Sequence, residues 1–191
     1  MIVSEEHRYV FVSVPKAGTH TMYATLTDGF GGRQLDGPYH QKDVPAEYLD
    51  FFCFASVRHP FQRAVSIWNS LTQRPNYSPK YLPLIGGDSF LEFARWIAKI
   101  NPANRPTGKG GVLLLSQAEW LEDVRLDRYL HLETINSDFA KLPFVSDDIV
   151  LAKLLARDHQ QWDELKCSES HELLRKRYAN DFQRFGYSDN Y

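Results

Sequence analysis

The chain has little cysteine, almost no net charge and no long apolar run. Its 191 residues include only two cysteines, Cys53 and Cys167, without the spacing of a zinc site or a disulfide framework. The net charge is −2 at pH 7, so no global basic field favours nucleic acid. No apolar segment approaches the ~20 residues that span a bilayer. We therefore predict no metal site, no nucleic-acid partner and no membrane span, and any anion site must be local.

The first residues also lack the pattern of a secretory signal. Residues 1–8 are largely polar and acidic, without a charged segment followed by an apolar one, so we predict no signal peptide and a cytoplasmic location. Cys53 lies in an apolar run and is predicted to be a core residue. With 43% apolar and 24% charged residues, the composition is that of a globular protein. We predict a single domain over residues 1–191.

Buried strands alternate with helices along the chain. The runs Tyr9–Val14, Phe51–Val57 and Arg128–Leu132 resemble strands of a parallel sheet. Helices are predicted from Thr19 and from Pro60, and a third is opened by the capping-box pair Ser89 and Glu92. A last helix is predicted over about Ser170–Phe185. The proline- and glycine-rich segment 74–87 is predicted to be a loop. This alternation predicts an α/β fold with a largely parallel sheet flanked by helices.

A candidate anion site follows the first predicted strand. The loop Val14-Pro15-Lys16-Ala17-Gly18-Thr19-His20-Thr21 joins the strand to a helix, at the sheet edge where α/β folds bind ligands. Unpaired N–H groups and the dipole at a helix start favour an anion, and Gly18 allows the main chain to approach it. Lys16 adds a full charge, and Thr19 and Thr21 add hydroxyl donors.

This loop differs from the ATP-binding loop G-x-x-x-x-G-K-[ST]. Lys16 precedes Gly18 by two residues, and no earlier glycine matches the motif. The next strand is followed by Arg58, where a kinase or ATPase needs an acid for magnesium. A cation at that position favours a ligand with a second phosphate. We therefore predict a P-loop-NTPase-like sheet that binds a different nucleotide.

A second candidate anion site follows the next strand, in Ser56-Val57-Arg58-His59-Pro60-Phe61. Arg58 can bind a phosphate through two hydrogen bonds, and the Ser66 hydroxyl, about two helical turns further on, can complete the contact. Taken singly, each residue has an ordinary interpretation, namely a surface ion pair for Arg58 and no role for Ser66. The two together with the Lys16 loop favour a binding role.

These motifs resemble those of sulfotransferases that use 3′-phosphoadenosine 5′-phosphosulfate (PAPS), in particular the carbohydrate-type, family 2-like branch. The similar segments are P-K-A-G-T-H-T and V-R-H-P-F-x-R-x-V-S, with weaker blocks at Ser116–Leu121, Tyr129–Glu133 and Tyr178–Tyr187. The resemblance implies that Lys16, Ala17, Gly18, Thr19, His20 and Thr21 hold the 5′-phosphosulfate. It implies that Arg58 and Ser66 hold the 3′-phosphate, and that no metal is needed. His20 departs from the pattern, which commonly has a small hydroxyl residue there.

The predicted activity is transfer of the sulfuryl group from PAPS to a hydroxyl, or to an amine, of a small-molecule or glycan acceptor. Lys16 is the candidate for the charge on the bridging oxygen. His40, in Gly37-Pro38-Tyr39-His40-Gln41, is the first candidate for the general base, with a solvated loop histidine as the alternative interpretation. His20 is the second candidate. His59 is expected to pack beside Arg58, and Glu133 and Asp181 are expected to be structural.

Two other functions fit the same motifs. One is a P-loop kinase of unusual form, and the other is a nucleotide-binding module without catalysis. Binding of 3′-phosphoadenosine 5′-phosphate or of ADP separates the first from a sulfotransferase, and turnover separates the second.

Overall fold

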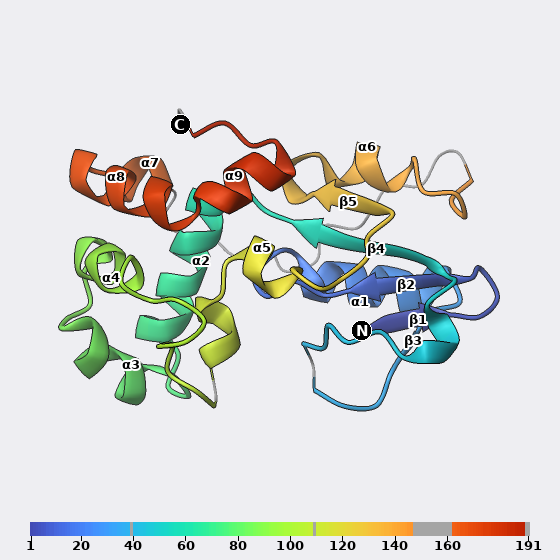
Figure 1. Ribbon diagram of the computed structural model, residues 1–191, viewed down its shortest axis with the longest axis horizontal. Coiled ribbons are helices and arrows are strands. Elements are labelled where there is room, and N and C mark those ends of the chain that lie inside the picture. Colours follow the sequence, from blue (N-terminus) through green and yellow to red (C-terminus); the bar gives the residue numbers. More distant parts are fainter. Residues whose placement is uncertain (39, 109, 147–161, 190–191) are drawn as a thin grey trace. The chain divides into compact units, whose positions relative to one another are not determined.

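The computed structural model describes residues 1–38, 40–108, 110–146 and 162–189. It contains two compact units, each built from separate stretches of the chain (Figure 1). The first comprises Met1–Arg58 and Trp120–Arg157, and the second comprises His59–Glu119 and Asp158–Tyr191. The single domain predicted over residues 1–191 stays a prediction, because two compact units can still unfold together.

The first unit is built on a five-stranded sheet, which confirms the α/β class. Its strands are β1 (Ile2–Ser4), β2 (Tyr9–Val12), β3 (Arg33–Gln34), β4 (Phe52–Val57) and β5 (Arg128–His131), in the order β3-β1-β2-β4-β5. The central strands β2, β4 and β5 are parallel, as predicted. However, β1 pairs antiparallel with both β2 and β3, so the sheet is mixed.

The strand register fixes where ligand-binding loops emerge. Val12 is paired with Ala55, and Val57 is paired with His131, so the three parallel strands end at one edge of the sheet. Carboxyl ends of parallel strands are the usual place for ligands in α/β folds.

Helices of the first unit cover one face of this sheet. The helix α1 (Thr19–Gly29) buries Met22 and Leu26 against Phe11 and Phe54, and α6 (Ile135–Phe139) adds Phe139 to the same cluster. Each fully buried side chain of this size contributes about 1.5–3 kcal/mol of transfer free energy. This cluster holds α1 at its place on the sheet. The short helices η1 (Ala46–Tyr48) and η3 (Leu132–Thr134) lie in connections.

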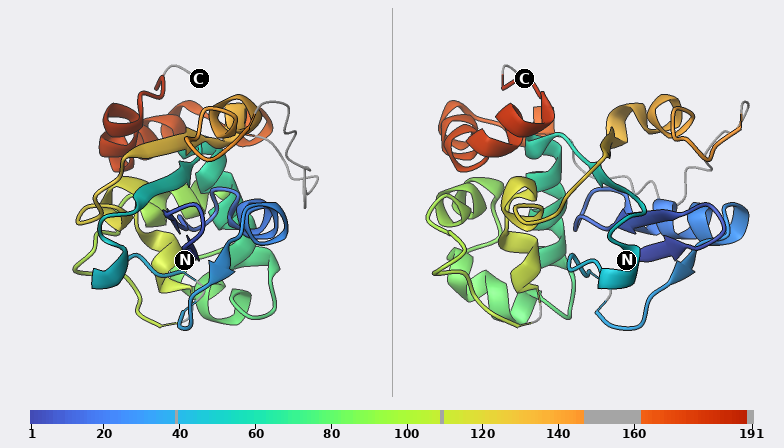
Figure 2. Two further views of the ribbon diagram at one scale, coloured as in Figure 1. Left: turned by 90° about the vertical axis from the view of Figure 1, so that its right-hand side faces the viewer. Right: turned by 45° about the vertical axis from the view of Figure 1, so that its right-hand side comes forward.

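The second unit packs around α2 (Pro60–Gln73), which contacts several other helices of the unit (Figure 2). Most of the helix is buried, and its apolar residues are at most 7% exposed at Phe61, Ala64, Val65, Trp68 and Leu71. The other helices are α3 (Ser78–Ile85), α4 (Phe90–Ile97), η2 (Gly111–Leu114), α7 (Trp162–Leu165), α8 (Ser168–Arg177) and α9 (Ala179–Phe185), with α5 (Gln117–Trp120) ending where the chain enters the first unit.

Two predictions of secondary structure were wrong. The segment 74–87 contains the helix α3, in which Pro79 occupies the first turn, where proline is tolerated, and Tyr81 and Ile85 are buried on one face. The predicted single last helix is in fact two helices, α8 and α9, joined at Tyr178.

The capping box of Ser89 and Glu92 is confirmed at the start of α4. Cys53 is a core residue, as predicted, and burial raises the pKa of its thiol to about 12.

Candidate functional site

The loop between β2 and α1 has an unusual main-chain conformation. Lys16 has φ +71°, a left-handed conformation that costs an L-residue about 1–2 kcal/mol. Gly18, which precedes the first residue of α1, has φ +83°. Left-handed residues in such a turn direct successive N–H groups to one side, which makes a concave site for an anion. Strained main-chain conformations of this kind are enriched at active sites and ligand-binding loops.

Three contacts hold the loop in this conformation. The Ser56 hydroxyl, on β4, donates a hydrogen bond to the Ala17 carbonyl at 2.5 Å. The Thr19 hydroxyl donates to the Val14 carbonyl at 3.0 Å. A side chain at Gly18 would place its Cβ 2.6 Å from Leu132, so the loop also packs closely against the residue that follows β5. The loop is therefore braced from the neighbouring strands.

The start of α1 gives this loop a positive electrostatic character. The Met22 N–H donates to the Gly18 carbonyl at 3.1 Å, so the helix and its dipole begin directly at the loop. Lys16 and Thr21 are partly buried, whereas His20 is exposed. The Thr19 hydroxyl donates its hydrogen to the Val14 carbonyl, within the loop. A contact between Thr19 and a ligand stays a prediction.

Arg58 emerges at the same edge of the sheet. It directly follows Val57, the last residue of β4, and is partly buried. The strand register thus brings the Lys16 loop and Arg58 to one edge of the first unit. Ser66 lies on α2 in the second unit and is 7% exposed, and its pairing with Arg58 stays a prediction. His59 packs against the rings of Phe61, Phe182 and Tyr187.

His40 lies beside the strand that precedes the loop. Its Nδ1 atom is 3.3 Å from the Oγ atom of Ser13, the residue that follows β2. The sequence singled out His40, whose role as a base stays a prediction, but not Ser13, because a lone serine after a strand belongs to no motif. Glu133, which is expected to be structural, is exposed in η3.

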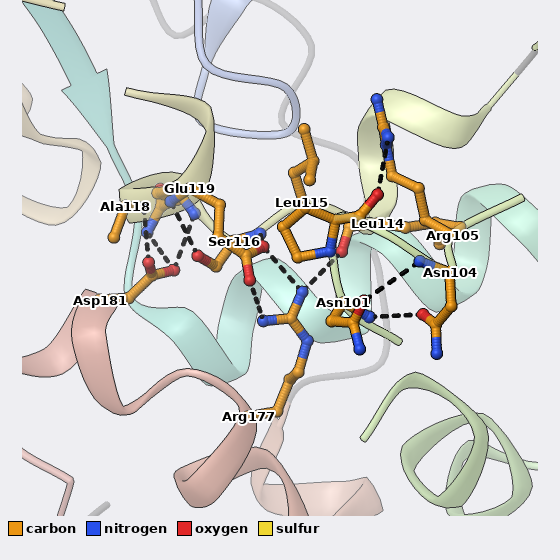
Figure 3. A network of polar contacts seen from close by, with 12 residues as sticks. Asn101, Asn104, Arg105, Leu114, Leu115, Ser116, Ala118, Glu119, Arg177 and Asp181 are labelled. Carbon is orange, nitrogen blue, oxygen red and sulfur yellow. Dashed lines mark hydrogen bonds and ion pairs between the residues drawn. The ribbon is translucent and has the colours of Figure 1, made fainter. Parts of the chain in front are cut away.

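The second unit contains a buried polar network of a different kind (Figure 3). Asp181 accepts hydrogen bonds from the main-chain N–H groups of Gln117 at 3.0 Å and Ala118 at 2.7 Å. Arg177 donates two 2.9 Å hydrogen bonds to Glu119. Both contacts join the last helices to the start of α5, so the predicted structural role of Asp181 is confirmed.

A cavity of about 290 Å³ also occurs in the first unit, lined among others by Lys42, Phe51 and Cys53. It lies at the amino end of β4, opposite the edge where the Lys16 loop emerges. We therefore do not assign the anionic ligand to this cavity.

In the described part of the chain, no three His, Cys, Asp or Glu side chains are grouped to hold a metal ion. No helix among the described residues is long and apolar enough to cross a membrane.

Comparisons of the chain with protein-family models, with curated proteins and with solved structures gave no match.

Proposed function

We propose that this protein is a PAPS-dependent sulfotransferase with a P-loop-NTPase-like nucleotide site. The observation that carries the proposal is the left-handed Lys16 in the braced loop before α1, with Arg58 directly after the adjacent parallel strand. Two cations at one sheet edge suit a nucleotide with two anionic groups, and the missing magnesium acid after β4 disfavours an ATP-type site. These supports lie within the first unit.

The residues of the loop have distinct roles in this proposal. The main chain from Lys16 to Thr21 would hold the 5′-phosphosulfate, with the α1 dipole adding partial positive charge. Arg58 would bind the 3′-phosphate through its planar guanidinium. The Ser56 hydroxyl acts indirectly, because its bond to Ala17 keeps the loop in the binding conformation.

The reaction is an in-line transfer of the sulfuryl group from the bridging phosphate oxygen to the acceptor atom, described here for a hydroxyl oxygen. The acceptor oxygen forms a bond to sulfur while the bond from sulfur to the bridging phosphate oxygen breaks. Negative charge develops on the departing oxygen, and the Lys16 ammonium stabilises it. The acceptor proton passes to a base, which we assign to His40, with His20 as the alternative. The acceptor is a hydroxylated or amino compound, with a glycan as the class that the resemblance favours.

Binding of matched nucleotides tests the assignment of Arg58. We expect wild-type protein to bind 3′-phosphoadenosine 5′-phosphate about 10–100-fold more tightly than adenosine 5′-monophosphate, because one charge-assisted contact is added. Arg58→Ala should remove this preference, whereas Lys16→Ala should weaken the binding of both nucleotides. The exposed Arg125→Ala variant, at the opposite end of the sheet, is the control.

The same titration separates the alternative functions. Stronger stabilisation by ADP than by 3′-phosphoadenosine 5′-phosphate would contradict the proposal and support a kinase. At about 100 times its dissociation constant, a bound ligand adds about 2.7 kcal/mol to the free energy of unfolding. Tight binding of the bisphosphate, without transfer of labelled sulfate to any hydroxylated acceptor, would indicate a binding module. If transfer occurs, Lys16→Ala should lower kcat by about 10²–10³-fold.

A further inference from the structure

The side chain of Trp120 is bonded to the main chain that enters the Lys16 loop. Trp120, the last residue of α5, is 6% exposed, and its indole N–H donates a hydrogen bond to the Ser13 carbonyl at 3.1 Å. The direction of this bond is fixed by chemistry, because an indole N–H only donates and a carbonyl oxygen only accepts. Both residues are buried, so breaking the bond carries a cost of desolvation.

Ser13 lies between the end of the strand and the strained turn. The last residue of β2 that is in register with β4 is Val12, which is paired with Ala55, so Ser13 lies just beyond the paired residues. The Tyr23 hydroxyl donates to Ser13 Oγ at 3.3 Å, so Ser13 is held through its side chain as well as its carbonyl. The left-handed Lys16 follows shortly after this anchored residue.

The loop is tied to residues outside it on both sides of Lys16. Before Lys16, the bond from Trp120 holds the Ser13 carbonyl. Directly after Lys16, the Ser56 hydroxyl holds the Ala17 carbonyl at 2.5 Å. A strained residue persists only where its surroundings over-determine its conformation, and two fixed points around one residue have this effect.

We propose that Trp120 is a positioning residue that holds Lys16 in its left-handed conformation. Its bond to the Ser13 carbonyl stops the main chain before the turn from rotating, so the turn cannot release its strain on that side. The inference rests on the proposed function for its catalytic meaning, since nucleotide binding and sulfuryl transfer both need a correctly directed Lys16.

Two variants remove the donor, and a third is a matched control. Trp120→Phe keeps an aromatic ring, and β-(3-benzothienyl)alanine at position 120 keeps the shape of tryptophan, but neither has the N–H. Trp68, in the second unit, is 7% exposed, and its indole N–H donates to the Asp88 carbonyl at 2.9 Å. Trp68→Phe therefore removes the same kind of buried bond from the other unit.

Nuclear Overhauser effects report the φ angle of Lys16 without any nucleotide. The amide and α hydrogens of one residue are close together at positive φ, so we expect a strong effect between these two hydrogens of Lys16 in the wild type. It should fall to the level of an ordinary residue in both Trp120 variants and stay strong in Trp68→Phe. A weak effect in the wild type, or a strong one in both Trp120 variants, would overturn the proposal.

Unfolding in urea gives a second readout. Because Lys16→Gly removes the strain, we expect it to raise the urea midpoint of the wild type. In the Trp120→Phe background the shift should be about half as large or less, because the strain has already been released. In the Trp68→Phe background the shift should equal that of the wild type. Equal shifts in all three backgrounds would contradict the coupling of Trp120 to Lys16.

Nucleotide binding separates this inference from the proposed function. Both Trp120 variants should bind 3′-phosphoadenosine 5′-phosphate and adenosine 5′-monophosphate about 3–10-fold more weakly, as expected for the loss of one hydrogen bond, and should keep the preference for the first. A loss of that preference without weaker binding of the monophosphate would contradict a role at the Lys16 loop. If the wild type shows no such preference, the proposed function fails, and the NMR and urea measurements still decide whether Trp120 holds Lys16.

Discussion

At the scale of single residues, Lys16 combines main-chain strain with a charge. Apart from glycines, only Arg8 and Lys16 among the described residues have positive φ. A charge could be supplied from an unstrained position, so the strain itself suggests that the direction of this lysine and its neighbouring N–H groups matters.

Replacing Lys16 by glycine should separate stability from ligand binding. Glycine removes the strain of about 1–2 kcal/mol but adds about 0.5–1 kcal/mol of chain entropy in the unfolded state. We therefore expect the free energy of unfolding in urea to rise by about 0.5–1 kcal/mol while affinity for 3′-phosphoadenosine 5′-phosphate falls. Arg8→Gly, at the other positive-φ position, should leave that affinity unchanged. A destabilised Lys16→Gly variant would show that Lys16 is not strained in solution.

The sequence indicated the charged residues of the candidate site, whose role stays a prediction, but not the residues that contact its loop. The types and spacing of Lys16, Gly18 and Arg58 indicated an anion site, because cations and glycine at strand ends have few other uses together. Ser13, Ser56 and Tyr23 act through contacts made by folding, and no local pattern marks them. Which donors touch a ligand stays a prediction for Thr19, Thr21 and Ser66.

At the scale of elements, long and regular patterns were the predictable ones. The predicted starts of α1 and α2, at Thr19 and Pro60, agree with the structure, because a glycine turn and an N-terminal proline mark them. The strands β1 and β3 have three and two residues, too few to show a period, and they were missed. The helix α3 was missed because its prolines were interpreted as loop residues.

The contact between α8 and α5 should make the protein sensitive to acid. Burial alone would raise the pKa of Glu119, but its bonds to Arg177 and to the Ser116 N–H bring the pKa below its ordinary value. A lowered folded pKa means that the stabilisation is complete above the unfolded pKa of about 4.3 and is lost as pH falls through the folded value.

The variant Glu119→Gln measures this contribution. At neutral pH it should lower the free energy of unfolding by about 3 kcal/mol, because Arg177 is left buried without its charge partner. The difference from wild type should shrink as pH is lowered towards about 3. Urea unfolding over a pH series gives both values, with the exposed Glu122→Gln as control. A difference that does not change with pH would contradict an ionic contact.

At the scale of the whole molecule, the first unit is discontinuous in sequence. Its sheet includes β5, and in the sequence β5 is separated from β4 by the segment His59–Glu119 of the second unit. A fragment of residues 1–58 would expose the edge of β4 and would leave Phe54 without Leu130 and Phe139.

We therefore expect the fragment of residues 1–58 to show no cooperative unfolding by circular dichroism. A sigmoidal urea transition of the fragment would contradict this. For the full chain, a single transition seen by every probe would support the predicted single domain, and two separate transitions would show two independent folding units.

The bond between Trp120 and Ser13 has a practical consequence. Trp120, one of the four tryptophans of the chain, donates its indole N–H to the Ser13 carbonyl immediately before the Lys16 loop. The NMR signal of a fluorine atom placed on that ring would report whether a nucleotide occupies the loop. This measurement needs no knowledge of the acceptor.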